Sequence, residues 1–84
     1  MPDYLVELYV PVAASSGLPK VADRARRAAA EMRREGTAVH YWRSIFVPED
    51  ETCFHVFEGP SAEAVGEASR RASIEYDRIV EAMQ

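Results

Sequence analysis

This chain of 84 residues has little of what usually carries metal or redox chemistry, because it contains one cysteine and two histidines. A single cysteine cannot form a disulfide within the chain, so nothing indicates an oxidising compartment. It also cannot hold a conventional iron–sulfur cluster, which needs several thiolates. The chain lacks a Gly-rich phosphate loop, a Cys-x-x-Cys pair and a nucleophile motif. These absences disfavour nucleotide-dependent and hydrolytic enzymes.

Positive charge and long apolar runs are equally scarce. The net charge is −4 and the pI is about 5.1, which argues against nucleic acid or an anionic membrane as the main partner. No apolar run approaches the roughly 18 residues of a membrane span. Asp3 stands where a signal peptide would be basic. We therefore expect a cytoplasmic protein.

The composition is that of a globular domain, with 48% apolar and 29% charged residues. Residues 1–84 suffice for one domain, near the lower size limit for a single core. A chain this short often gains stability by burying a further apolar surface in a dimer. The length therefore predicts one domain and favours self-association.

The spacing of apolar residues predicts four strands and two helices. The segment DYLVELYVP alternates between two faces, which is typical of a half-buried strand. One face carries Tyr4, Val6, Leu8 and Val10, and the other carries Leu5, Glu7 and Tyr9. Apolar stripes of helical spacing follow at residues 20–36 and after the N-cap Ser61. The remaining strands are TAVHYWRSIFV (residues 37–47), TCFHVFEG (residues 52–59) and YDRIVEAM (residues 76–83).

The order of elements is therefore β-α-β-β-α-β. Two such units usually form a four-stranded antiparallel sheet with both helices on one face, a ferredoxin-like α+β sandwich. The helices leave the other face of the sheet uncovered. We expect the function to reside on this open face.

The charged turn PEDE sets the register of the central hairpin. With Val47 opposite Thr52, the next same-face pairs are Phe46–Cys53, Ser44–His55 and Trp42–Phe57. We expect these pairs on the open face, together with Leu5, Glu7, Tyr9 and His40. The alternate set, Ile45–Phe54 and Arg43–Val56, is then expected to cover the helices.

Such a face is too aromatic to remain exposed on a free monomer. We expect a homodimer with the two sheets packed face to face, leaving a small-molecule pocket where the packing is incomplete. The residues expected in this interface or pocket are Tyr9, Trp42, Phe46 and Phe57. Trp42 and Phe57 have two interpretations, as interface residues or as rings that stack on a ligand.

Several segments resemble a family of small bacterial ferredoxin-like proteins, first catalogued as a domain of unknown function. The resemblance is carried by YLVELYVP, by Trp42 with the apolar strand end after it, by FHVFEGPSAEAVGEASRRA and by YDRIVEAM. One branch of that family is nickel-binding and dimeric. The resemblance therefore implies nickel as a cofactor or cargo, and a homodimer. This chain departs from members that carry His near Ser44 and Cys near His55.

Nickel suits imidazole nitrogen, with carboxylate and water completing its shell. His55 is the first candidate ligand, followed by His40, Glu7 and Cys53. His40 lies too far along its strand to share an ion with Cys53 unless a second chain supplies it. We therefore predict a divalent-metal protein that sequesters or buffers nickel.

Each candidate ligand also has a structural interpretation. Cys53 can be a small buried apolar residue and His55 a hydrogen-bonded sheet residue. His40 can be a solvated side chain. Because Glu7 is expected among aromatic side chains, its carboxylate needs a compensating partner, and it can pair with Arg43 or Arg78.

A third hypothesis is a small dimeric α+β barrel enzyme that acts on an apolar, oxygenated molecule. Its cleft would lie between sheet and helices. The lining expected for it is His55, His40, Tyr9, Glu7 and Trp42. A His–Glu pair within hydrogen-bond reach could abstract a proton.

Overall fold

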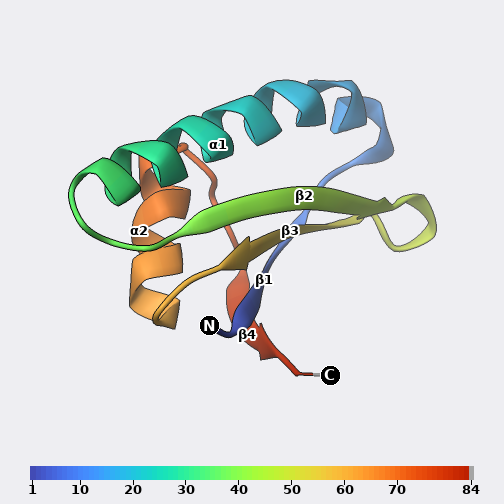
Figure 1. Cartoon of the computed structure of the whole chain (residues 1–84). Helices are drawn as coiled ribbons and strands as arrows, with labels where there is room; N and C mark the ends of the chain where they lie inside the picture. Colours follow the sequence, from blue (N-terminus) through green and yellow to red (C-terminus); the bar gives the residue numbers. More distant parts are fainter. Residues whose placement is uncertain (84) are drawn as a thin grey trace.

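The computed structural model describes residues 1–83. The elements run in the order β1 (Asp3–Tyr9), the 3-10 turn η1 (Val12–Gly17), α1 (Leu18–Arg34), β2 (His40–Val47), the 3-10 turn η2 (Pro48–Asp50), β3 (Thr52–Glu58), α2 (Ala62–Arg71) and β4 (Arg78–Ala82). The strands form one antiparallel sheet in the spatial order β2-β3-β1-β4, with the helices packed on one face (Figure 1). The predicted ferredoxin-like α+β sandwich is confirmed.

The helices form where the sequence supplies both an apolar stripe and end signals. α1 has Pro19 in its first turn and Arg33 and Arg34 in its last. Its buried face is small, consisting of Ala22, Ala25, Ala28, Ala29 and Met32. α2 is capped as predicted, because the Ser61 hydroxyl accepts a hydrogen bond from the Ala64 backbone N–H at 3.1 Å.

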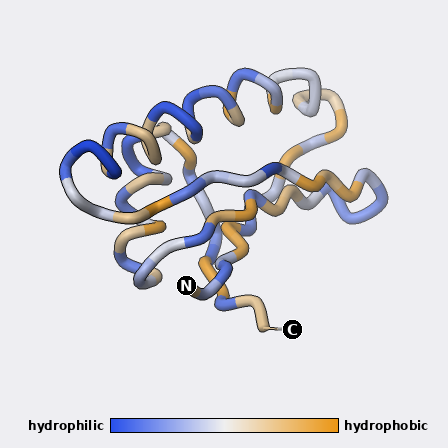
Figure 2. The backbone as a smooth tube through the Cα atoms, viewed as in Figure 1, coloured by the Kyte–Doolittle hydropathy of each residue, from blue (hydrophilic) through white to orange (hydrophobic). Residues whose placement is uncertain are grey.

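The core lies between the helices and the inner face of the sheet. Figure 2 shows hydrophilic residues recurring along α1, with the strongly hydrophobic ones concentrated in the strands. The largest contributions from the sheet are Tyr4, Val6, Tyr41 and Phe57, each at most 7% exposed. Val65 and Ala68 of α2 pack against the same cluster. The alanine-rich face of α1 lets the helix lie close to these bulky strand residues.

The predicted hairpin register is confirmed for the pairs near the turn, where Val47 pairs with Thr52 and Phe46 with Cys53. Ser44 also pairs with His55, as predicted. The register shifts between Tyr41 and Arg43, so Trp42 is an extra residue in β2. A bulge places two residues of one strand opposite one residue of its neighbour. The expected Trp42–Phe57 pair is therefore wrong, and Tyr41 pairs with Phe57.

The expected faces are also wrong, and inverted, for β3 and for Arg43 to Phe46 of β2, whereas His40 and Trp42 lie on the open face as expected. β1 pairs with β3 so that Val6 lies opposite His55 and Leu8 opposite Cys53. Cross-strand partners share a face, and the Val6 face is the one that the helices cover. The inner set therefore includes Cys53, His55, Phe57, Phe46 and Ser44, whereas the open face carries Leu5, Glu7, Tyr9, Phe54, Val56, Ile45 and Arg43.

The end of α2 provides a stability test, because Ser73 has a left-handed backbone with φ 58°. Its N–H donates to the Arg70 carbonyl and the Ile74 N–H donates to the Ser69 carbonyl, as in a helix end that favours glycine. We predict that Ser73→Gly raises the free energy of unfolding by about 0.5–1 kcal/mol, because glycine has no Cβ strain there. Urea denaturation measures the change. Ser73→Ala is the control and should not stabilise; a lower midpoint for Ser73→Gly would contradict the assignment.

Candidate metal centre

Cys53 and His55 form a buried polar pair on β3. They are successive inward-facing residues of the strand, since every second side chain shares a face. The Cys53 Sγ lies 3.7 Å from the His55 Nε2, and neither residue is exposed to solvent. The sequence prediction that these two side chains point the same way is confirmed, although they point beneath the helices.

Tyr41 holds the other side of the imidazole. Its hydroxyl lies 3.3 Å from the His55 Nδ1, and its ring packs edge-on against Phe57 with centroids 5.1 Å apart. When Nδ1 carries the proton and donates to this hydroxyl, Nε2 keeps a lone pair directed toward Cys53. Such outer partners fix the orientation and tautomer of metal-binding histidines. Tyr41 was not among the predicted site residues, because no local sequence pattern indicates the bulge that turns it inward.

Burial keeps both members of the pair neutral. Desolvation lowers the pKa of His55 from 6.5 to about 4 and raises the pKa of the Cys53 thiol from 9.0 to about 11. At neutral pH the imidazole is therefore unprotonated, which is the form that binds metals. The thiol keeps its proton, so a metal must displace that proton to bind sulfur.

The other two candidate ligands lie on the opposite face of the sheet. The Glu7 carboxylate accepts a hydrogen bond from Arg78 Nε at 3.2 Å, which confirms one of its two expected ion-pair partners. The His40 ring stacks on Trp42 with centroids 5.6 Å apart. The expectation that Glu7 shares a face with His55 is wrong, because Glu7 pairs with Phe54 and so faces away from the helices. Within residues 1–83, no group of three or more Cys, His, Asp or Glu could hold a metal ion.

The predicted interface set divides between the two faces. Tyr9 is 61% exposed and Trp42 is 54% exposed, as an interface requires. Phe57 is fully buried in the core, and Phe46 pairs with Cys53 on the inner side. For Phe46 and Phe57 the open-face placement is therefore wrong, and the reason is the inverted phase of the hairpin.

A cavity of about 400 Å³ opens beside His55, between the end of β1, the start of α1 and the segment after α2. Of the five residues expected to line such a cleft, His55 and Tyr9 do so. His40, Glu7 and Trp42 do not, and the expected His–Glu proton-abstracting pair is wrong because its members lie on opposite faces.

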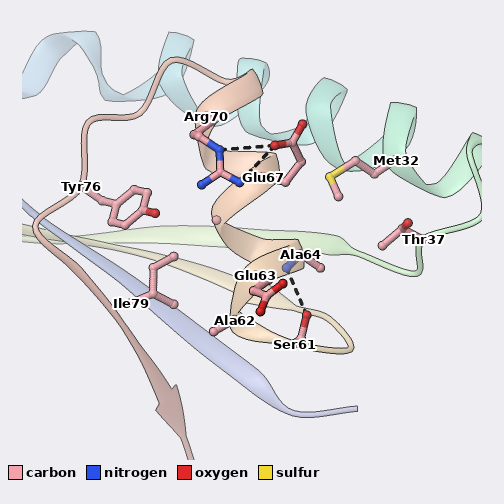
Figure 3. Close-up of a pocket in the computed structure, with 11 residues that line it drawn as sticks. Met32, Thr37, Ser61, Ala62, Glu63, Ala64, Glu67, Arg70, Tyr76 and Ile79 are labelled. Carbon is pink, nitrogen blue, oxygen red and sulfur yellow. Dashed lines mark hydrogen bonds and ion pairs between the residues drawn. The ribbon is translucent and has the colours of Figure 1, made fainter.

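A larger hollow of about 660 Å³ lies where α2, the end of α1 and β4 meet (Figure 3). Among its polar lining residues, Ser61 caps α2 and Arg70 pairs with Glu67 at 3.1 Å. Thr37, Glu63 and Tyr76 complete the polar part of the lining. Of the helices in residues 1–83, neither is long and apolar enough to span a membrane.

The depressed pKa of His55 predicts a pH dependence of stability. Above pH 6.5 the imidazole is neutral in both states; as the pH falls to about 4, the unfolded state gains a proton that the folded state resists. Stability is therefore lost across this window and levels off below it. The cost corresponds to about 3 kcal/mol.

We predict that His55→Gln removes this loss, so that the difference in unfolding free energy between wild type and variant changes by up to about 3 kcal/mol from pH 7 to pH 4. Urea denaturation at a series of pH values measures it. His40→Gln is the matched control and should follow the wild type. Equal pH profiles for His55→Gln and His40→Gln would refute the assignment.

Two comparisons relate this chain to known proteins, and a third finds no match. A family model described as nickel responsive protein SCO4226-like matches residues 4–82. A crystal structure of SCO4226 from Streptomyces coelicolor A3(2) is similar, with a TM-score of 0.69 and 25% sequence identity over 98% of this chain and 96% of that one. No curated protein matches significantly. Because the family model spans nearly the whole chain, this protein belongs to the SCO4226-like family of nickel responsive proteins.

Proposed function

We propose that this protein binds a divalent transition metal, nickel, for sequestration or buffering, through His55 and Cys53. The distance between the two donors carries the proposal. Nitrogen and sulfur donors at about 2.0 and 2.3 Å from one ion lie about 3.0 Å apart at the angle of about 90° in a square-planar or tetragonal shell, which nickel favours, and about 3.5 Å apart at the tetrahedral angle that zinc favours. The observed 3.7 Å between Nε2 and Sγ is longer than both separations, so the two side chains reach a shared nickel ion by a small approach of one toward the other.

The donor types and their surroundings support the same assignment. Imidazole and thiolate both suit nickel, and a bound divalent ion deprotonates a coordinating thiol. Two protein donors leave positions on the ion for water, which the cavity beside His55 has room to supply. The description of the family as nickel responsive supports nickel over other divalent ions. Glu7 and His40 are left out of this ion's shell because they lie on the other face.

Calorimetric titration of the metal-free protein with nickel tests the proposal. We predict saturable binding that is weakened at least about tenfold by His55→Ala or Cys53→Ala, because each change removes one of two protein donors. Tyr41→Phe should weaken it about tenfold by removing the group that orients the imidazole. In buffers of different ionisation enthalpy, wild type should release a proton that Cys53→Ala does not.

His40→Ala is the control, since it removes an equal imidazole from the open face. It should bind nickel as the wild type does. If His40→Ala loses affinity while His55→Ala keeps it, the ion lies on the open face and the proposed ligands are wrong. No saturable binding to wild type would end the metal proposal.

We also propose that the protein is a homodimer through the open face of the sheet. Tyr9, Trp42 and Ile45 lie there and are 61%, 54% and 42% exposed, and clustered exposed apolar side chains are typical of an interface. Phe54 and Val56 continue this surface on the central strand. Packing against a second copy would remove it from water.

Light scattering across a concentration series should give a dimer mass for the wild type and a monomer mass for Ile45→Glu, since a buried charge in the interface is costly. Val12→Glu is the control: Val12 is 51% exposed but lies in η1, outside the sheet. It should remain dimeric. A monomeric wild type at micromolar concentration would contradict this proposal.

A further inference from the structure

We propose that the cavity beside His55 is a binding site for a small apolar monocarboxylate, whose carboxylate pairs with Arg24. This site lies in the cleft between the helices and the inner face of the sheet. It goes beyond nickel binding, since it requires no metal and uses a different anchoring residue. The cavity volume of about 400 Å³ falls in the range of small-molecule sites.

The walls of the cavity are mainly apolar. They are built from the end of β1 and the residue that follows it, from α1 and from the segment after α2; the residues are Leu8, Val10, Leu18, Val21 and Ile74. His55 is the polar residue in the buried part of the wall, and burial keeps it neutral. An apolar tail therefore gains from leaving water here, whereas a charged group would find no counter-ion at this depth.

Arg24 supplies a fixed positive charge in the cavity wall. Its Nε donates a hydrogen bond to the Ala72 carbonyl at 2.8 Å, which ties the guanidinium to the end of α2. None of the ion pairs formed within residues 1–83 involves Arg24. Its terminal nitrogens are therefore free for a carboxylate, which a guanidinium binds with two parallel hydrogen bonds.

The charges around Arg24 favour a single negative charge. Lys20 and Arg27 lie about one turn away on α1 and share a surface hollow with Arg24 and Asp23. The Asp23 carboxylate pairs with Arg26 at 3.2 Å, so the three cations of the hollow leave the local field positive. Glu75 also lines the cavity and opposes this field. The single negative charge of a monocarboxylate therefore matches the single positive charge of Arg24 in the cavity wall. A phosphate dianion would be repelled more strongly by Glu75 and would find no second cation in the cavity.

The test is an NMR titration of the metal-free protein with straight-chain alkanoates of four to ten carbons, each compared with the alcohol of the same length. We expect affinity to rise about two- to fourfold per methylene group until the chain outgrows the cavity. Each alcohol should bind at least about tenfold more weakly than its acid. Shifts should concentrate at Val21, Ile74 and Leu8. Because no nickel is present, failure here leaves the metal proposal standing.

Paired variants locate the two ends of the ligand. Arg24→Gln should weaken octanoate binding at least about tenfold, whereas Arg34→Gln, the same charge change at the far end of α1, should leave it unchanged. Glu75→Gln should tighten binding. Gly17 lines the cavity, and a Cβ added there meets no atom within 4 Å. The side chain introduced by Gly17→Leu should therefore fit without a clash, occupy cavity space and block binding. No saturable alkanoate binding, equal binding of acid and alcohol, or equal effects of Arg24→Gln and Arg34→Gln would overturn the proposal.

Discussion

The pairing of β1 with β3 determines which side chains meet in this protein. Val6 lies opposite His55 and Tyr4 opposite Phe57, and Val6 and Tyr4 are held inward by the helices. A shift of one residue would turn the whole of β3 over, since side chains alternate with a period of two. Cys53 and His55 would then lie on the open face beside Glu7. The observed register instead encloses the only cysteine together with His55 and leaves the other histidine outside.

Enclosure gives the Cys53–His55 pair its chemical character. Two ionisable groups can be buried here because each is neutral and each has a hydrogen-bonding neighbour. Within residues 1–83 no buried side-chain nitrogen or oxygen lacks such a partner. Burial also raises the pKa of the Cys53 thiol, so that a metal ion can bind the sulfur only by displacing the thiol proton. Metal affinity, pH and fold stability are therefore linked through one pair of residues.

The ferredoxin-like layout was predictable from the sequence because each element carries its own signal. The alternation from Tyr4 to Val10, the alanine stripe of α1 and the Ser61 cap all agree with the structure. The turn also set the hairpin register correctly from Val47 to Ser44.

The phase of β3 was not predictable in the same way. In TCFHVFE both faces read as apolar, since Phe54 and Val56 alternate with Cys53 and Phe57. A histidine is more easily placed on a surface than in a core, unless a buried partner such as the Tyr41 hydroxyl is known. Tyr41 points inward only because Trp42 is an extra residue in β2. A bulge depends on pairing with a neighbouring strand, so one strand's sequence does not reveal it.

We propose that Cys53 and His55 bind one metal ion because the fold encloses them on the same side of β3. X-ray absorption spectroscopy of the nickel-loaded protein tests this most directly, since it distinguishes sulfur from nitrogen and oxygen neighbours of the metal. We expect one sulfur neighbour per nickel ion, together with an imidazole nitrogen. A shell of nitrogen and oxygen alone would place the ion away from Cys53 and contradict binding by the pair.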